Sequence, residues 1–340
     1  MPDSRRYLST FLFLLFLLFA TCGCATTQNR QAELLPSRST YRTGPFVIHS
    51  HKPIRQKDTI VRELESLSRS VATKIGATPA PNAQKPVDVY ILADDQSFRH
   101  FLQYYHPELP PRRAYFIATA KTRSVYTYAG DHLMEDLRHE ATHAIVNLTH
   151  PGLPLWLDEG LAEYFEHPDK SQTSDNHQDR FLADIETGSI PDLKQLESVT
   201  DVSKMSPRNY REAWAWARWG LDGPTPVRQS FSHYLADIAK LGEAESRDAL
   251  KPLSGRWAAL PETEGFNTSA SAMLAWLRLN QSGKSGQPNL AASAKFDSSV
   301  QQTRLQDELE AAPARPTKSS TLGRNRPGFF GRLRKSLFGG

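Results

Sequence analysis

The segment His139-Glu140-Ala141-Thr142-His143 has the residue types and spacing that bind a metal ion. On a helix, residues four apart share a face, so both imidazoles can point at one ion. Zinc accepts neutral imidazole nitrogens and does not require thiolates, which this chain lacks beyond residue 24. Glu140 lies one step round the helix and reaches a water on the metal rather than the metal itself. On the motif alone, the alternative interpretation is a pair of histidines that are buried in a helical core and hydrogen-bonded there.

A second segment, Pro154 to Glu166, indicates another helix shortly after the first. A catalytic zinc ion takes three protein ligands and keeps a fourth position for water. A glutamate at the start of a second, antiparallel helix would supply the third ligand. Glu159 and Glu163 are four residues apart and share a helix face, so geometry alone leaves both as candidates.

Together with the histidine motif, the run Trp156-Leu157-Asp158-Glu159-Gly160-Leu161-Ala162-Glu163-Tyr164 resembles the gluzincin metallopeptidases, the thermolysin-like, peptidase MA-like superfamily. The resemblance is specific over 131–167 and extends by element order over 41–221. It implies a zincin-like fold, Zn²⁺ as cofactor, Glu159 as the third ligand, and Glu163 as acceptor of a hydrogen bond from a ligand histidine. The spacer after His143 is shorter than in the best-known gluzincins, which keeps Glu163 as the competing ligand.

The reaction implied by this resemblance is hydrolysis of an amide in a peptide or protein substrate. Zinc lowers the pKa of a bound water, and Glu140 is the expected general base. We expect Tyr210 to stabilise the oxyanion, because related enzymes often place a tyrosine on a later helix. Tyr126, Tyr128 and His233 are the alternatives for this role. A non-catalytic envelope binding or scaffold protein that retains a zincin fold is the alternative function.

The elements before the motif predict an α+β fold with a small mixed sheet and helices over one face. Strands are expected at 46–48 and 87–92, and a hairpin at 114–119 and 123–128. In gluzincins such a hairpin offers its edge strand to an extended substrate. Apolar residues at three- and four-residue steps predict a helix over 58–75. A second helix is expected over 95–105, ending near Pro107.

The rest of the chain is expected to be helical around the metal motif and beyond it. Asp131 can cap a helix that ends at His150, and a second helix runs from about 153 to 167. A polar loop is expected over 168–180 and helices over 181–280. The expected organisation is a signal peptide (1–23), a tether (24–40), an α+β part (41–130), a zinc-binding helix pair (131–170), a helical C-terminal part (171–280) and a disordered basic tail (281–340).

The N-terminus resembles a bacterial lipoprotein signal, with a short basic segment, an apolar run and then small residues with two cysteines. Cys24, which follows Gly23, is the expected lipidated residue, and Cys22 is the alternative. This resemblance implies an exported protein of the bacterial cell envelope, held by a lipid anchor on the periplasmic or surface face of a membrane.

The formal net charge of +4 is unevenly distributed. Residues 312–340 carry seven basic side chains and no acidic one, so the body of the chain is mildly acidic. An exported, acidic body offers no electrostatic footprint for nucleic acid, and we expect none as a partner. The sequence carries no signal for an oligomeric state.

Overall fold

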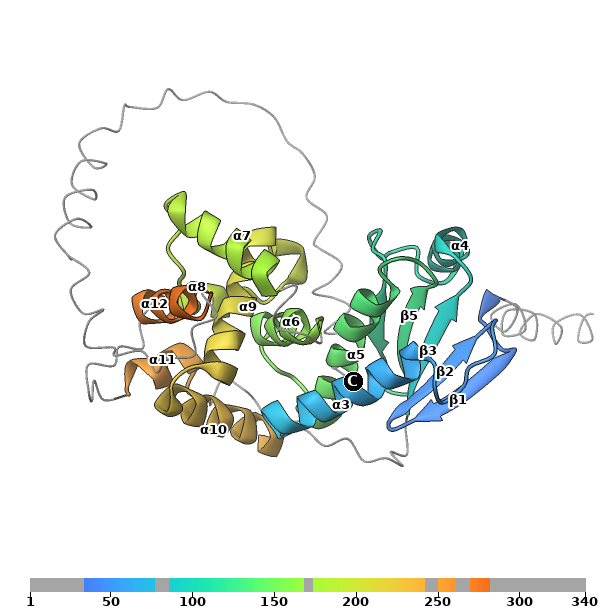
Figure 1. The fold of residues 1–340 in the computed structure, drawn as a ribbon, viewed down its shortest axis with the longest axis horizontal. Helices are drawn as coiled ribbons and strands as arrows, with labels where there is room; N and C mark the ends of the chain where they lie inside the picture. Colours follow the sequence, from blue (N-terminus) through green and yellow to red (C-terminus); the bar gives the residue numbers. More distant parts are fainter. Residues whose placement is uncertain (1–33, 77–85, 168–173, 242–249, 261–269, 282–340) are drawn as a thin grey trace, which may run out of the picture. The chain divides into compact units, whose positions relative to one another are not determined.

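The computed structural model describes residues 34–76, 86–167, 174–241, 250–260 and 270–281 (Figure 1). The expected signal peptide, Cys22, Cys24, most of the tether and the basic tail from residue 282 lie outside these residues. The described residues form two compact units, the first made of 34–70 and 86–145 and the second of 71–76 and the residues from 146 onward. Two helices, α3 (Thr59–Ile75) and α5 (Leu133–Thr149), run from the first unit into the second.

The first unit contains a five-stranded mixed sheet in the order β1-β2-β3-β5-β4. The central strands are parallel, and β1–β2 and β4–β5 are antiparallel pairs at the two edges. The strands are β1 (Ser39–Thr43), β2 (Phe46–Ser50), β3 (Val87–Leu92), β4 (Tyr115–Ala118) and β5 (Arg123–Tyr128). This confirms the α+β class and the hairpin. β1 begins at Ser39, two residues inside the segment expected to be a tether, because its polar residues give little strand signal.

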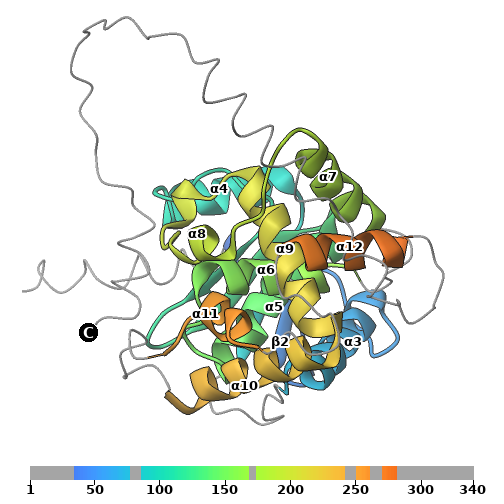
Figure 2. The ribbon, with the colours of Figure 1, turned by 90° about the vertical axis from the view of Figure 1, so that its left-hand side faces the viewer.

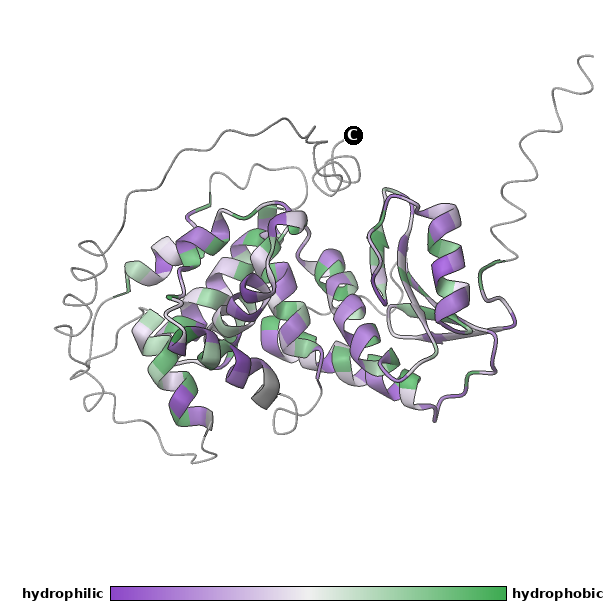
Figure 3. Ribbon diagram, turned by 90° about the horizontal axis from the view of Figure 1, so that it is seen from above, coloured by the Kyte–Doolittle hydropathy of each residue, from purple (hydrophilic) through white to green (hydrophobic). Residues whose placement is uncertain are grey.

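One face of the sheet is aliphatic and the other is aromatic. Ile48, Val89 and Val125 lie opposite one another on three strands and are fully buried. On the other face, Tyr126 packs against Phe101 of α4 (Asp95–Tyr105), with ring centroids 4.8 Å apart. The first-unit parts of α3 and α5 lie on the opposite side of the sheet from α4 (Figures 1 and 3). The expectation that helices cover only one face of the sheet was therefore wrong. Aromatic residues alternate with aliphatic ones along the strands, so the aromatic face also needs a helix to bury it.

The predicted helix over 58–75 and helix over 95–105 are confirmed as α3 and α4, and the cause of their ends is visible. Gly76 takes a left-handed conformation (φ +69°) after the last turn of α3, where a side chain would be strained. Asp94 caps α4 by accepting a hydrogen bond from the Ser97 amide (2.8 Å). The helices of both units carry hydrophilic and hydrophobic residues in alternate bands, as amphipathic helices do (Figure 3).

The second unit is helical in its described residues, as expected. Its helices are α6 (Leu155–Phe165), α7 (Ser174–Glu186), α8 (Leu193–Glu197), α9 (Pro207–Asp222), α10 (Thr225–Leu241), α11 (Leu253–Ala258) and α12 (Ala270–Gln281), with a 3₁₀ turn at Val202–Lys204. The loop expected over 168–180 was wrong from Ser174 onward, where α7 begins. Its first turns are polar, and the apolar residues that hold it, Phe181 and Leu182, come only later.

Helix α9 packs against α6, α7, α8 and α10 and organises the second unit (Figure 2). Its start is secured by a capping box between Ser206 and Asn209, with Pro207 in the first turn. Where α6 meets α9, a Cβ built on Gly160 would overlap the backbone carbonyl of Ala213. Gly160 is therefore the residue that lets the two helices approach so closely.

Candidate metal centre

His139 and His143 lie on one face of α5, and their imidazoles point toward each other. Their Nε2 atoms are 3.3 Å apart, and both rings are half-buried. Two ligands about 2.0 Å from a tetrahedral zinc ion lie about 3.3 Å apart. The helix therefore holds two nitrogen donors at the separation that such an ion requires, and the donor chemistry fits zinc.

Helix α5 is held in the first unit by both apolar and polar contacts. Leu137, Ala141 and Ala144 are fully buried and form the apolar stripe beside the histidines. Arg138, which is only 2% exposed, donates from Nη1 to Oε2 of Glu63 on α3 at 3.0 Å. A buried guanidinium with a specific partner resists rotation of the helix, so the histidine face keeps its direction.

Glu140, the expected general base, is bound to the edge strand of the sheet. The Phe116 amide on β4 donates to its Oε2 at 2.6 Å. This is a short hydrogen bond to a carboxylate, of the charge-assisted kind. One carboxylate oxygen is held by the strand backbone, and β4 lies at the edge of the sheet beside that carboxylate.

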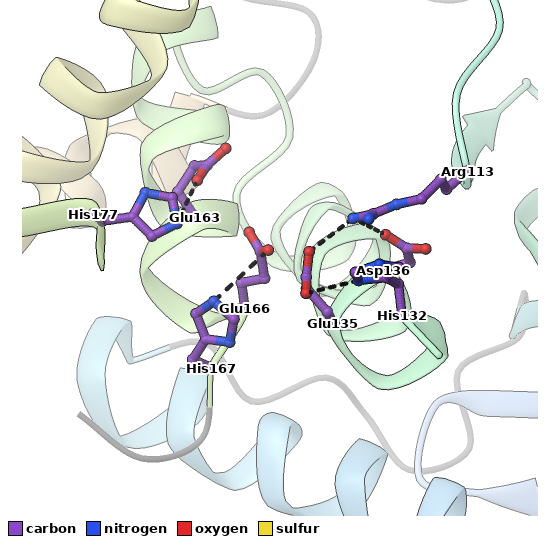
Figure 4. Close-up of polar contacts among 8 residues, drawn as sticks. All are labelled: Arg113, His132, Glu135, Asp136, Glu163, Glu166, His167 and His177. Atoms are coloured by element: carbon purple, nitrogen blue, oxygen red, sulfur yellow. Dashed lines mark hydrogen bonds and ion pairs between the residues drawn. The ribbon is translucent and has the colours of Figure 1, made fainter. Parts of the chain in front are cut away.

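Charged side chains surround the first turn of α5 (Figure 4). Arg113 Nη2 lies 2.7 Å from Glu135 Oε1 and 2.8 Å from Asp136 Oδ1, and His132 Nδ1 lies 3.3 Å from Glu135 Oε2. Burial raises the pKa of Asp136 to about 6, against the opposing effect of the Arg113 charge. These acids also favour the helix because they sit near the positive end of its dipole.

Glu159 lies in the second unit, on α6, and is 7% exposed. It immediately precedes Gly160, so the close approach of α6 to α9 determines the position of this part of the helix. Buried carboxylates are paired with other groups or coordinate metals. Only five residues, 150–154, separate α5 from α6, and Gly152 in this connection has a left-handed backbone (φ +85°). A tight turn therefore joins the helix with the histidines to the helix with Glu159.

Glu163 and Tyr210 are also found on helices of the second unit. Glu163 Oε2 lies 3.4 Å from Nε2 of His177 on α7. Tyr210 is half-buried in the first turn of α9. Tyr126 lies in the aromatic cluster under α4, and His233 is exposed on α10. The roles expected for Glu163 as a hydrogen-bond acceptor and for Tyr210 as an oxyanion donor stay predictions.

Sequence reasoning missed two features of these helices. The Phe116 amide carries no side-chain signal, because its role depends on how the strand lies beside α5. The contact of His177 with Glu163 was hidden by the expectation of a loop over 168–180.

No protein-family model and no curated protein matches this sequence. Within the described ranges, none of the helices is long and apolar enough to cross a membrane.

Proposed function

We propose that this chain is a zinc-dependent metallopeptidase of the gluzincin type, with a zincin-like fold, in which His139, His143 and Glu159 bind the zinc ion. The observation that carries the proposal is the pair of facing Nε2 atoms 3.3 Å apart on α5. Glu140 lies beside this pair with one oxygen held by the Phe116 amide.

The choice of Glu159 as third ligand is supported by its burial and by the short connection between α5 and α6. A carboxylate that is only 7% exposed is a suitable metal ligand, because metal coordination offsets the cost of burying its charge. Two histidines and a glutamate would make the ligand set of a catalytic zinc site, with one coordination position open for water. The site requires that the start of α6 folds back on the histidine face of α5.

The residues of this chain then divide the work of peptide hydrolysis. Zinc bound to this set supplies a Lewis acid that polarises a carbonyl and lowers the pKa of a water molecule. The Phe116 amide holds Oε2 of Glu140, and the other carboxylate oxygen would act as the general base that accepts a proton from water. Glu140 returns this proton to the leaving amine. An extended substrate pairs with the edge strand β4, and Tyr210 donates to the oxyanion.

The proposal includes an exported, lipid-anchored chain in the bacterial cell envelope. Its support is the signal-like sequence that ends in Cys24, with Cys22 as the alternative acceptor. Metabolic labelling with a radioactive fatty acid tests it. We expect the label to be lost in Cys24→Ala and kept in Cys22→Ala, and unchanged labelling of Cys24→Ala would overturn the assignment.

The test of the enzymatic function is zinc quantitation combined with cleavage of a mixed peptide library. We expect bound zinc and cleavage that stops on addition of a chelator and returns with Zn²⁺. Glu159→Gln should hold about one equivalent of zinc less than the parent, whereas Glu163→Gln should keep the parent's content; the opposite result would make Glu163 the ligand. Bound zinc without any cleavage would support the alternative, a binding or scaffold protein with a retained zincin fold.

A further inference from the structure

The end of α6 and the start of α7 bring two imidazoles and two carboxylates together inside the second unit (Figure 4). Glu163 lies in the last turn of α6, and Glu166 and His167 follow directly after the helix ends at Phe165. His177 reaches the same place from α7. One ligand atom of each of Glu166, His167 and His177 lies within 4.8 Å of the others, so these three residues form a compact group of metal donors.

The imidazoles and carboxylates of this group form two ion pairs. His177 Nε2 lies 3.4 Å from Glu163 Oε2, and His167 Nε2 lies 3.9 Å from Glu166 Oε1. Charge-assisted hydrogen bonds between such groups measure about 2.7–2.9 Å. Donors around one tetrahedral zinc ion lie about 3.3 Å apart, so small side-chain rotations bring these atoms to the separation of ligands.

The His177 ring is held in its orientation by neighbours that are themselves anchored. It stacks on Trp214 of α9, with ring centroids 5.9 Å apart, and the Arg218 guanidinium lies over the same indole at 5.2 Å. Arg218 donates to Gln178 Oε1 at 2.6 Å, and Gln178 Nε2 donates to the Leu277 carbonyl at 2.8 Å. Such support keeps a ligand's orientation fixed before the metal arrives.

We propose that Glu166, His167 and His177 bind a second divalent transition-metal ion, in addition to the zinc ion proposed on α5. The Glu163 carboxylate beside His177 adds negative charge that favours a cation. The two imidazoles and a carboxylate select zinc-like ions over Mg²⁺ or Ca²⁺. The ion joins the end of α6 to α7 and stabilises the second unit by binding only the folded state.

This inference does not depend on the proposed peptidase function, and the experiment separates the two sites. The full chain is purified in detergent without a polyhistidine tag, saturated with Zn²⁺, desalted and analysed for bound metal. The parent should hold about two equivalents of zinc, one for each group of donors. His167→Ala combined with His177→Ala should hold about one and keep its chelator-sensitive cleavage.

Two further variants complete the comparison. His139→Gln combined with His143→Gln should also hold about one equivalent, and Zn²⁺ should still raise its Tm, because the second site is intact. His100→Ala, which removes an exposed histidine on α4, should match the parent. One equivalent in the parent, or two in the His167 and His177 double variant, would overturn the proposal.

A third experiment uses a variant that gains a spectroscopic signal, so that the proposal can be tested even if the double variant fails to fold. His177→Cys exchanges an imidazole for a thiol at the same place, and thiolates bind zinc-like ions well. On titration with Co²⁺, this variant should develop a thiolate-to-cobalt charge-transfer band that the parent lacks. A folded His177→Cys protein without that band, as judged by circular dichroism, would exclude His177 as a ligand.

Discussion

The two units position their polar groups by different means. In the first unit, hydrogen bonds between elements far apart in sequence hold the groups on α5. Phe116 binds Glu140, and Glu63 binds Arg138. In the second unit, Glu159 is positioned by helix packing, since Gly160 allows α6 to lie against the backbone of α9. Directional bonds orient single side chains, whereas packing at a glycine places a whole helix.

The largest effect is expected where the first unit orients a reacting group. Glu140→Gln should lower kcat by about 10²- to 10⁴-fold while zinc stays bound, because the amide keeps the shape but accepts no proton at this site. Steady-state kinetics on a peptide from the library, with metal analysis, measure it. Glu135→Gln, an acid on the same helix, is the matched control. Equal kcat for Glu140→Gln and the parent would show that Glu140 is not the general base and would contradict the proposed peptidase mechanism.

The next effect tests the polar anchor of α5. Glu63→Gln leaves the nearly buried Arg138 without its carboxylate, which should reduce the free energy of unfolding by about 2–3 kcal/mol. Urea denaturation followed by circular dichroism gives the value. Asp95→Asn removes the exposed pair with Arg99 and should leave the transition midpoint unchanged. If both variants behaved alike, the Glu63 carboxylate would not contribute to the stability of the α5 position.

A smaller loss is expected from the packing contact in the second unit. Gly160→Ala forces α6 away from the Ala213 carbonyl and should cost about 1–3 kcal/mol, although alanine is the better helix former. The comparison variant is Gly255→Ala on α11, where the nearest atom belongs to the flexible Lys251 side chain and the change should be neutral or stabilising. Urea titrations of both proteins decide. A stabilised Gly160→Ala protein would show that the close approach is not needed.

The smallest effect concerns the charge cluster at the start of α5. Burial raises the pKa of Asp136 to about 6 in the folded chain, above its ordinary value. The folded state therefore binds this proton more tightly, and the group's contribution to stability is lost as pH rises through 6. Between pH 5 and pH 8 the parent should lose on the order of 1 kcal/mol that Asp136→Asn does not lose. Parallel slopes for the two proteins would show that Asp136 titrates normally.

The sequence alone was sufficient for the features that depend on local periodicity. A helix through residues 139 and 143 places two histidines on one face whatever else the chain does. The bounds of α3, β3 and α4 follow in the same way from apolar spacing and from Gly76 as a stop signal. The expectation failed at β1 and at the start of α7. Both segments are rich in polar residues, which give little strand or helix signal, and they are stabilised by packing against neighbouring elements.

Only the tertiary structure decided which groups from distant segments meet. That the Phe116 amide holds Glu140, that Glu63 neutralises Arg138, and that His177 lies beside Glu163 depends on segments 24, 75 and 14 residues apart in sequence. No local pattern encodes such pairings, because they follow from how the strands and helices pack. The sequence determined the types of the candidate ligands and their spacing along each helix, and packing decided what surrounds each of them.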